Sequence, residues 1–459
     1  VGVSQVRPVV ACETQPHDPE ICMRLDPTPL VLFATLSSAL LLSVPASAVA
    51  CGSRQQQESW PAWRGADGLG LAAGNPPKEW SEDKNVKWKT EIPGLGLSTP
   101  ITWGDRIYVT TAVKGVNADD SKGKWNAYDF RVLCLDRGDG QILWSTSVNN
   151  AVPHAKVHPT NSQASNSPVT DGERIYAHFG SRGLFCLDMD GEELWSRDFG
   201  EMQRDHEFGG GASPVLTDKA LLIIWDHDGD SFFYALDKKS GRELWKQPRD
   251  EGATWATPAV TKVGRKTLAI VPASGKSRAY DVKNGKVVWE VSGLTSNVIP
   301  SPVVVDGIVY LMSGYQGTAL QAIKLKGAKG DLEGSKNVLW THNRQTPYVP
   351  SSLVYQGSIY FLRNTQSVLS CLDAKTGKVH YDGKRLRGLR DVYASPIDAG
   401  GHVYFASRDG KVKVIKASDE YEEVATNELD DGFDASPIVI GDELYLRGRR
   451  SLYCISDLD

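Results

Sequence analysis

Short apolar stretches separated by polar turns fill the chain after residue 60, and no long segment there repeats its apolar positions with a helical period. The stretches recur in groups of four. A strand that follows Ser-Pro or Thr-Pro leads to a Tyr-bearing strand, then to a strand ending in Leu-Asp or a close variant, and then to a strand that reaches Trp or Tyr. This pattern predicts an all-β protein made of repeated four-stranded units.

The signal that opens each unit occurs eight times, at intervals of mostly about 40 to 50 residues. Its members are Thr99-Pro100, Ser167-Pro168, Ser213-Pro214, Thr257-Pro258, Ser301-Pro302, Ser395-Pro396 and Ser436-Pro437, with Ser351-Ser352 as a degenerate form. Four strands at this spacing are typical of a propeller blade. We therefore expect an eight-bladed β-propeller of antiparallel blades. Seven blades is the alternative, if the degenerate sixth unit is not a blade.

The two ends of the repeat region complete each other. The last unit, residues 435 to 455, has three strands, whereas Asn85-Val86-Lys87-Trp88 forms an outer strand before the first Ser-Pro signal. Pairing these segments closes the ring by main-chain hydrogen bonds and leaves no open seam between the first and last blades. The sequence thus predicts that an N-terminal strand completes the last blade.

Most units carry a large aromatic residue on the outer strand, and we expect it to fill the wedge between blades that splay from the axis. These structural docking residues are Trp88, Trp144, Trp195, Trp245, Trp289 and Trp340, with Tyr381 in the sixth unit. The turn before this strand contains a Gly that supplies a positive φ. These glycines are Gly140, Gly191, Gly241, Gly285 and Gly377.

The N-terminal segment predicts export. Met23-Arg24, a candidate translation start, precedes an apolar run from Leu30 to Val44, which is about half as long as a membrane span. Small residues follow as far as Ala50. We assign residues 1–50 to an upstream extension and signal peptide, residues 51–59 to a Gln- and Ser-rich tether, and residues 60–459 to one propeller domain.

Two cleavage sites remain open. Ala46-Ser47-Ala48 suits ordinary signal peptidase, whereas Ala48-Val49-Ala50-Cys51 is typical of a lipoprotein signal, with Cys51 as the lipidation candidate. Either site predicts an exported protein, in the periplasm or anchored to the bacterial cell envelope. The formal net charge of -5, with Lys and Arg scattered among acids, makes nucleic acid an unsuitable partner.

The succession of Ser-Pro, Tyr, Ala/Cys-Leu-Asp, Thr-Gly and Trp resembles the tryptophan-docking repeat of pyrroloquinoline-quinone (PQQ)-type propellers, from about Trp60 to Ile455. The stretches that begin at Trp60, Asp226 and Arg249 resemble a branch of exported PQQ-like repeat proteins. The resemblance implies two functional classes. One is the quinoprotein alcohol and sugar dehydrogenases, and the other is the non-catalytic propeller lipoprotein of the outer-membrane β-barrel assembly machine.

Dehydrogenases of this repeat class carry a disulfide between adjacent cysteines, a Ca2+ held by Glu, Asn and Asp, and an Asp base. This chain has seven cysteines and no adjacent pair. Cys134, Cys186, Cys371 and Cys454 share the third-strand position that Ala235 and Ala279 occupy elsewhere, so we interpret them as small core residues. We therefore predict no cofactor; PQQ with Ca2+ belongs to the alternative function.

Two patterns suggest metal ligands, but each lacks a feature that a metal site requires. Asp226-His227-Asp228-Gly229-Asp230 resembles a calcium loop, but Ser231 stands where the loop requires Gly. His154 and His158 have i, i+4 spacing, but Pro153 and Pro159 disfavour the helix that would align them. We therefore predict no metal site. The chain also contains no Gly-x-Ser-x-Gly, P-loop or dinucleotide-binding motif.

The inter-blade loops and the loops between the second and third strands share one face of a propeller. The longest predicted loops, 111–130, 145–166 and 196–212, fall in blades one to three, so this sector is the candidate binding face. Its candidate residues are His154, His158, His206, Glu207, Asp226, His227, Asp228, Asp230, Arg249, Glu251 and Trp255. The alternative is that these are ordinary polar loop residues and a packed Trp.

These observations favour a monomeric, exported, non-catalytic propeller that acts as a binding or scaffold module in the cell envelope. We expect its partner to be a protein or another envelope macromolecule, bound through the loop-rich face. We expect contact with the membrane only through an N-terminal lipid anchor. The alternative function is a PQQ- and Ca2+-dependent quinoprotein dehydrogenase.

Overall fold

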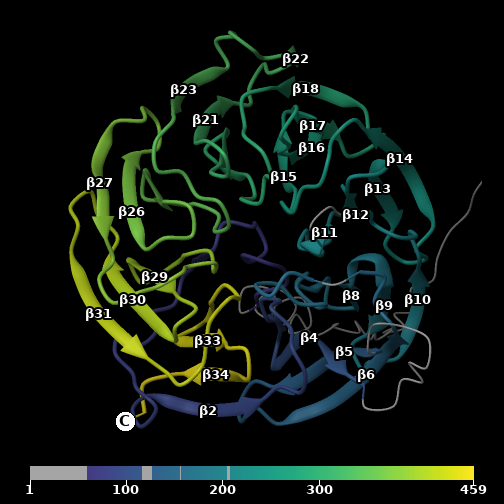
Figure 1. Cartoon of the computed structure of the whole chain (residues 1–459), viewed down its shortest axis with the longest axis vertical. Helices are drawn as coiled ribbons and strands as arrows, with labels where there is room; N and C mark the ends of the chain where they lie inside the picture. Colours follow the sequence, from purple (N-terminus) through teal and green to yellow (C-terminus); the bar gives the residue numbers. More distant parts are fainter. Residues whose placement is uncertain (1–58, 116–126, 156, 204–206, 459) are drawn as a thin grey trace, which may run out of the picture. The chain divides into compact units, whose positions relative to one another are not determined.

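The computed structural model describes residues 59–115, 127–155, 157–203 and 207–458 and places them in eight β-sheets. The sheets follow one another around a central axis as the blades of a propeller (Figure 1). This confirms the predicted all-β, eight-bladed fold. The sixth unit forms a complete blade despite its degenerate signal. Among the described residues the one helical element is the 3-10 turn η1 (Gly180–Arg182).

Each blade contains four antiparallel strands, ordered from the central channel to the rim. Blades 1 to 4 are made of β3 (Ile101–Trp103), β4 (Arg106–Lys114), β5 (Tyr128–Asp136) and β6 (Ile142–Ala151); β7 (Val169–Thr170), β8 (Arg174–His178), β9 (Leu184–Asp188) and β10 (Glu193–Arg197); β11 (Val215–Leu216), β12 (Ala220–Trp225), β13 (Ser231–Asp237) and β14 (Glu243–Arg249); and β15 (Ala259–Val263), β16 (Lys266–Val271), β17 (Ser277–Asp281) and β18 (Val287–Val291).

Blades 5 to 8 are made of β19 (Val303–Val305), β20 (Ile308–Ser313), β21 (Ala319–Lys324) and β23 (Val338–His342); β24 (Leu353–Tyr355), β25 (Ser358–Leu362), β26 (Val368–Asp373) and β27 (Val379–Arg385); β28 (Ile397–Ala399), β29 (His402–Ala406), β30 (Lys411–Lys416) and β31 (Glu423–Glu428); and β32 (Ile438–Ile440), β33 (Glu443–Arg447), β34 (Ser451–Ile455) and β2 (Val86–Glu91). Two blades gain a fifth, parallel strand that the repeat pattern did not predict. These are β22 (Gly330–Asp331) in blade 4 and β1 (Leu71–Ala72) in blade 7.

A strand's place in its blade determines its pattern of burial. Inner strands lie between two neighbouring blades and bury both faces, so all six residues of β12 are buried. Rim strands have one half-covered face, and β14 alternates between half-buried and exposed residues until its last position. The continuous apolar runs and the alternating Trp strands of the sequence are therefore two consequences of the same stacking.

The N-terminal strand closes the ring as predicted. β2 pairs antiparallel with β34, with Val86 opposite Ile455 and Glu91 opposite Ser451. Figure 1 shows this strand, near the N-terminal end of the colour scale, beside the last strands of the chain. Blade 8 therefore takes its rim strand from one end of the repeat region and its other three strands from the other end.

The rim aromatics touch two blades at once. Trp88 lies opposite the small Cys454 in its own blade, and its Nε1–H donates to the carbonyl of Arg137 in blade 1 at 3.0 Å. A Cβ atom added to Gly140 would lie 2.5 Å from the Trp88 ring. The Gly is thus required both by its positive φ and by the space that the indole occupies. The same arrangement places Trp144 on Gly191, Trp195 on Gly241, Trp245 on Gly285 and Trp340 on Gly377.

Two rim positions depart from this arrangement. Trp289 is fully buried where β22 pairs with β18. In blade 7 the position opposite Val414 is Ala425, which is too small to fill the wedge. Trp80, a buried residue that lies before the first predicted strand, stacks on Tyr404 of blade 7 with ring centroids 6.4 Å apart. The segment before β2 therefore supplies the aromatic side chain that the repeat omits.

The loops of blade 1 are shorter than predicted. β4 continues to Lys114, β5 begins at Tyr128 and β6 continues to Ala151, so strand residues occupy parts of the expected 111–130 and 145–166 loops. The backbones of these strand ends are paired within the blade, and Phe130 packs against Phe179 of blade 2 with ring centroids 5.4 Å apart.

Residues 60–72, here called the floor segment, run across the central channel. At one end the Trp60 carbonyl accepts from Thr102 in blade 1, and the Pro61 carbonyl accepts from Thr170 in blade 2. At the other end β1 pairs with β28 of blade 7. Arg64 also lies at that end, bonded to main-chain carbonyls of blades 6 and 7. These contacts are made to the innermost strands or to residues beside them, so the floor segment lies inside the ring of blades.

Candidate functional site: a funnel lined by hydroxyl groups

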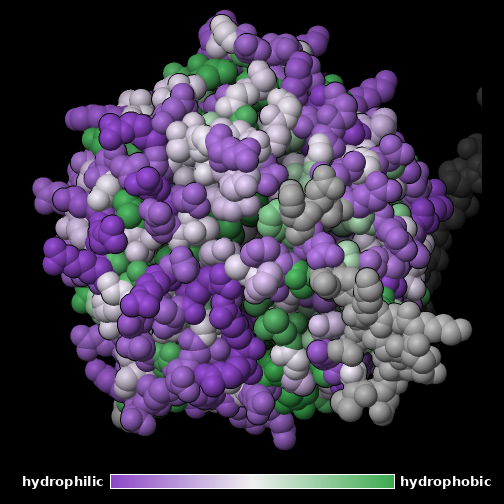
Figure 2. Space-filling view, in the orientation of Figure 1, coloured by the Kyte–Doolittle hydropathy of each residue, from purple (hydrophilic) through white to green (hydrophobic). Residues whose placement is uncertain are grey.

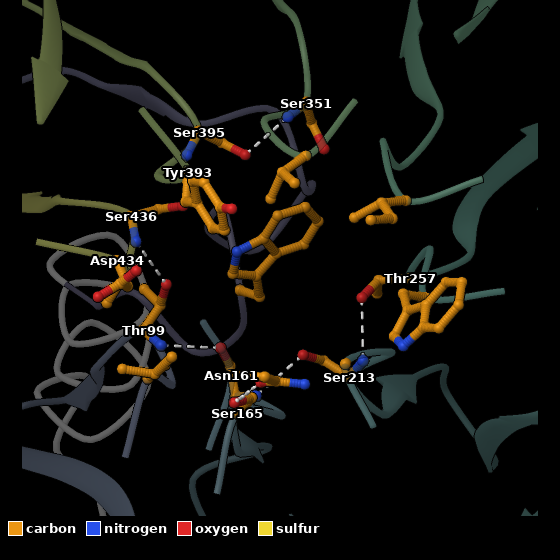
Figure 3. Close-up of a pocket in the computed structure, with 18 of the residues that line it drawn as sticks. Thr99, Asn161, Ser165, Ser213, Thr257, Ser351, Tyr393, Ser395, Asp434 and Ser436 are labelled. Carbon is orange, nitrogen blue, oxygen red and sulfur yellow. Dashed lines mark hydrogen bonds between the residues drawn. The ribbon is translucent and has the colours of Figure 1, made fainter. Parts of the chain in front are cut away.

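The residue that opens each repeat takes part in a closed circle of hydrogen bonds around the channel. In every case its backbone N–H donates to the side-chain hydroxyl of the equivalent residue in the next blade, and Figure 3 shows several of these bonds. The bonds are Thr99 to Ser167 (2.9 Å), Ser167 to Ser213 (2.9 Å), Ser213 to Thr257 (3.0 Å), Thr257 to Ser301 (2.8 Å), Ser301 to Ser351 (2.9 Å), Ser351 to Ser395 (2.9 Å), Ser395 to Ser436 (3.0 Å) and Ser436 to Thr99 (3.1 Å). We call these eight residues the hydroxyl ring.

The hydroxyl ring explains the conserved form of the repeat signal within this chain. A hydroxyl is needed to accept the neighbour's N–H, and Ser or Thr supplies it at all eight positions, including Ser351, where Pro is absent. The sequence singled out these residues only as strand starts. A signal was available, because the hydroxyl type is kept where the following Pro is not.

Each ring hydroxyl keeps its own hydrogen. Its oxygen accepts one backbone N–H, and among the described residues none of the eight hydroxyls donates to another protein group. A hydroxyl has one O–H donor besides its lone pairs, so eight donors remain for whatever occupies the channel.

The hydroxyl ring lies in a funnel of about 260 Å³. Trp63 of the floor segment lines it, and inter-blade loops form the rest of its wall. The apolar and aromatic part of this wall consists of Leu97, Phe208, Trp255, Ile299, Tyr348, Val349 and Tyr393. Figure 2, in the orientation of Figure 1, shows apolar side chains near the axis, beside strongly hydrophilic side chains over β29, β30 and β33.

Contacts behind the wall hold its aromatic rings. The Trp255 Nε1–H donates to the Gly209 carbonyl at 2.8 Å, and Phe208 meets Trp255 edge to face with centroids 6.0 Å apart. Tyr348 stacks on Tyr315 at 4.8 Å. The wall is therefore built from supported side chains, which lowers the cost of ordering them around a bound group.

One carboxylate lines the funnel among the described residues, and two arginines hold it. Asp434 lies 2.6 Å from Arg408 Nε through one oxygen and 2.7 Å from Arg449 Nε through the other. The Arg408 guanidinium also lies over the Tyr393 ring, 4.3 Å from its centroid. Asp434 is thus committed to an ion-pair cluster whose net charge is positive.

Two further arginines are buried beside the hydroxyl ring and form no ion pair among the described residues. Arg64 donates to the carbonyls of Ser352 (2.8 Å) and Pro396 (3.3 Å), each next to a ring member. Arg447 donates to the carbonyls of Ser98 (3.0 Å) and Thr110 (2.7 Å). Burial lowers the pKa of Arg64 to about 10 and that of Arg447 to about 9, so both remain charged at neutral pH.

The structure separates the residues of the predicted binding face into groups. His158 and Trp255 line the funnel. His154 and Glu207 line a smaller neighbouring cavity of about 50 Å³. His154 lies 3.3 Å from Glu201, and burial lowers its pKa. His206 and Cys51 lie outside the described residues.

A second group braces the loops from inside blades 3 and 4. Asp226 and Arg249 form a fully buried ion pair, with Nε–Oδ1 2.7 Å, and Arg249 also donates to Tyr280 at 2.6 Å. Glu251 accepts from the backbone N–H groups of residues 275 and 276. His227 accepts the Gly229 N–H through Nδ1 at 3.0 Å.

Asp228 and Asp230 are exposed on the same loop, away from the buried Asp226. Within the described part of the chain, no group of three or more His, Cys, Asp or Glu residues is arranged to hold a metal ion. In the same residues, no helix is both long and apolar enough to cross a membrane.

The four described cysteines lie in the blade interior. Cys134, Cys186, Cys371 and Cys454 are buried and unpaired. Burial raises their thiol pKa values to about 12, 12, 11 and 12, respectively. Since the thiolate is the reactive form, these side chains act as packing groups at neutral pH.

Comparison with known proteins decides the family. The model of the PQQ-like family described as outer membrane protein assembly factor BamB matches residues 128–382 and 292–457. The chain belongs to this family. The predicted resemblance to PQQ-like repeat proteins and to the assembly-machine propeller is therefore confirmed. A BamB-family relative from Yersinia pestis, named outer membrane protein assembly factor BamB, is 23% identical over 338 residues, which cover 69% of this chain and 77% of that protein.

Solved structures share the BamB-family fold. The crystal structure of BamB from Moraxella catarrhalis superposes with a TM-score of 0.54 at 15% identity and covers 80% of this chain and 97% of that one. A europium-containing methanol dehydrogenase superposes with a TM-score of 0.61 at 11% identity and covers 88% of this chain and 92% of that one. At these identities the likeness concerns the fold alone, because one propeller serves both binding proteins and enzymes.

Proposed function

We propose that this chain is an exported propeller of the bacterial cell envelope that binds a protein partner through its loop face and performs no chemistry of its own. Membership of the BamB family supports an envelope role. The observation that carries the non-catalytic assignment is the pairing of Asp434 with two arginines. The one acid among the described residues lining the funnel is held by Arg408 and Arg449 and is not free to act as a base.

The alternative function, a quinoprotein dehydrogenase, needs residues that this chain lacks. The resemblance implies adjacent cysteines over PQQ and acids that hold Ca2+. The sequence has no adjacent cysteines, and the described cysteines are dispersed among blades 1, 2, 6 and 8. Asp434 already pairs with Arg408 and Arg449, and the funnel offers no second carboxylate among the described residues. The residues present therefore do not fit PQQ with Ca2+.

Position favours the loop face as the binding surface. The inter-blade loops surround the funnel mouth, whereas the turns after the third strands lie at the opposite ends of the blades. Loops positioned by a rigid scaffold are common sites of recognition. The loop face also presents exposed acids at Asp228 and Asp230. We propose that the partner is a protein and that the propeller binds it as a monomer.

Site-specific photo-crosslinking in cells tests this proposal. A photoreactive amino acid at Asp228, on the loop face, is expected to capture an envelope protein. The matched positions are Lys239 and Lys375, which are exposed in third-to-fourth-strand turns at the opposite face and should capture none. Capture from the opposite face alone would contradict the proposal. Separately, reproducible alcohol or sugar oxidation after addition of PQQ and Ca2+ would assign the protein to the dehydrogenases.

We also propose that Cys51 anchors the mature protein to a membrane through a lipid. Metabolic labelling with radioactive palmitate is expected to mark the protein, and globomycin, which blocks lipoprotein signal peptidase, is expected to delay its processing. A Cys51→Ala protein should lose the label but retain the propeller. Retention of the label by this variant would contradict the anchor.

A further inference from the structure

The hydroxyl hydrogens of the eight ring residues have no acceptor among the described protein groups. Each oxygen is engaged by a neighbour's N–H, and no described protein group accepts the hydroxyl hydrogens. A ligand that brings acceptor oxygens would complete these bonds. Each ring oxygen also keeps a second lone pair, so the ring alone suits a donor as well as an acceptor, and the charges around it decide between the two.

Positive charges outnumber negative charges around the hydroxyl ring. Arg64 and Arg447 are each buried next to ring members and form no ion pair in the described residues, although the charge of Asp67 acts on Arg64. Arg447 has no such carboxylate among them, and burial without a counter-charge is unfavourable. The Asp434 cluster adds two arginines to one acid. An anion in the funnel would be attracted by these groups, and the low dielectric of the buried site strengthens the attraction.

The other wall residues limit the size and shape of the anion. A volume of about 260 Å³ lies below the range of pockets that hold drug-sized molecules, so the ligand is compact. Trp63, Trp255, Tyr348 and Tyr393 provide aromatic surface. A group with one charged end and a small apolar or flat body satisfies both the hydroxyls and the aromatic wall.

We propose that the funnel binds a carboxylate group, with its oxygens taking hydrogen bonds from the hydroxyl ring and its body against the aromatic wall. The carboxylate belongs either to a small free acid or to an acidic side chain of a protein partner. The acidic side chain as a source rests on the proposed function, since a partner on the loop face would reach the funnel from its open mouth. The free acid as a source is independent of the proposed function.

Calorimetric titration of the full chain with benzoate and with its neutral amide, benzamide, tests the charge requirement. Benzoate is expected to bind at least about tenfold more tightly than benzamide, because only the carboxylate is attracted by the arginines. Binding of the two at equal strength, or no saturable benzoate binding at concentrations up to about 10 mM, would overturn the proposal.

A pair of variants at Val349 locates the binding. Val349 lines the funnel and is half-buried, so a longer side chain there enters the wall without breaking a hydrogen bond of the ring. Val349→Glu should weaken benzoate binding at least about tenfold relative to Val349→Gln, which has the same shape without the charge. Equal binding by the two variants would overturn the proposal, since the anion would then lie elsewhere.

Arginine variants test the source of the attraction. Arg447→Met should weaken benzoate binding by about tenfold, with benzamide binding unchanged as its internal control. Unaltered benzoate binding in the folded variant would contradict the role of Arg447. If this variant does not fold, Arg64→Lys provides the comparison, because it keeps the charge below the ring and is expected to retain binding, whereas Arg64→Met is not.

The two sources of the carboxylate are distinguished by a capped peptide with one central aspartate and by the same peptide with asparagine. Tighter binding of the aspartate peptide than of benzoate assigns the site to a protein partner, and the reverse order assigns it to a free acid. Loss of cross-linking at the loop face with intact benzoate binding would refute the proposed function and leave the carboxylate site standing. Intact cross-linking without benzoate binding would refute the carboxylate site and leave the proposed function standing.

Discussion

The backbone N–H of Ser436 donates a 3.1 Å hydrogen bond to the hydroxyl of Thr99, and this contact joins the last blade to the first at the channel. At the rim the same two blades meet through Trp88, whose indole N–H reaches the Arg137 carbonyl. The closure of the ring therefore has an inner and an outer contact. The inner contact recurs between every pair of blades, and the indole bond of Trp88 recurs at Trp245 and Trp340, so the seam where the chain ends meet uses contacts found elsewhere in the ring.

Removing the Thr99 hydroxyl should weaken the inner contact. Thr99→Val keeps the size of the side chain but leaves the Ser436 N–H without its acceptor, and we expect the free energy of unfolding to fall by about 1 kcal/mol. Thr99→Ser preserves the hydroxyl and is the control. Urea unfolding followed by tryptophan fluorescence measures the difference. Equal midpoints for the two variants would show that the hydrogen bond contributes nothing to the closure.

Substitutions at two glycines with nearly the same φ distinguish the cost of backbone strain from the cost of a steric clash with a Trp ring. Gly140 has φ +75° and faces the Trp88 ring, whereas Gly307 has φ +73° and no atom within 4 Å of an added Cβ. Gly307→Ala should cost about 1 kcal/mol of stability from the left-handed backbone alone. Gly140→Ala should cost about 2 kcal/mol more, because the indole must move. Thermal or urea unfolding of both variants checks this, and equal losses would argue against tryptophan docking as the reason for the Gly.

The ring architecture could be predicted from the sequence because every blade needs the same residue types at equivalent positions. Apolar inner strands, a Gly turn and a rim Trp recur with one period, and the extra strand before Thr99 matched the strand missing after Ile455. Ser351 has the hydroxyl of the repeat without the Pro, and the sixth unit still joins the ring through it. These features are local and repeated, so pattern alone reveals them.

The floor segment and the buried charges could not be found in this way. Arg64 lies 288 residues before Ser352 in the chain and contacts it only because the ring brings blade 6 to the end of the floor segment. Asp226 and Arg249 read as exposed loop residues, yet they form a pair inside the propeller. Contacts between single, unrepeated residues depend on the three-dimensional closure, and a repeat pattern holds no information about them.

The buried cysteines should tolerate loss of sulfur but not added bulk. Cys186 lies opposite Trp195, and the equivalent position opposite Trp245 is Ala235. Cys186→Ala should therefore cost about 1 kcal/mol or less, whereas Cys186→Leu should cost about 1 to 3 kcal/mol because it presses on the indole. Unfolding curves give both values. A severe loss in the Ala variant would point to a role for the thiol beyond packing.

Asp398 should make the stability of blade 7 depend on pH. Its side chain lies in β28, where the backbone N–H bonds the Gly70 carbonyl of the floor segment, and one carboxyl oxygen is buried without a partner. Burial raises the pKa of Asp398 to about 7. At a pH below about 4 the carboxyl is protonated in both the folded and the unfolded chain, so it contributes no difference.

Between about pH 4 and pH 7 the unfolded chain releases this proton and the folded chain keeps it, so the free energy of unfolding should fall as the pH rises. The rise in the pKa of Asp398 from its ordinary value to about 7 sets an upper limit of about 4 kcal/mol on this loss. Asp398→Asn removes the titration, so the difference in unfolding free energy between this variant and the parent chain should grow across that window and level off above pH 7. A constant difference from pH 4 to pH 8 would mean that Asp398 titrates normally and that its carboxyl reaches solvent or a partner in the folded protein.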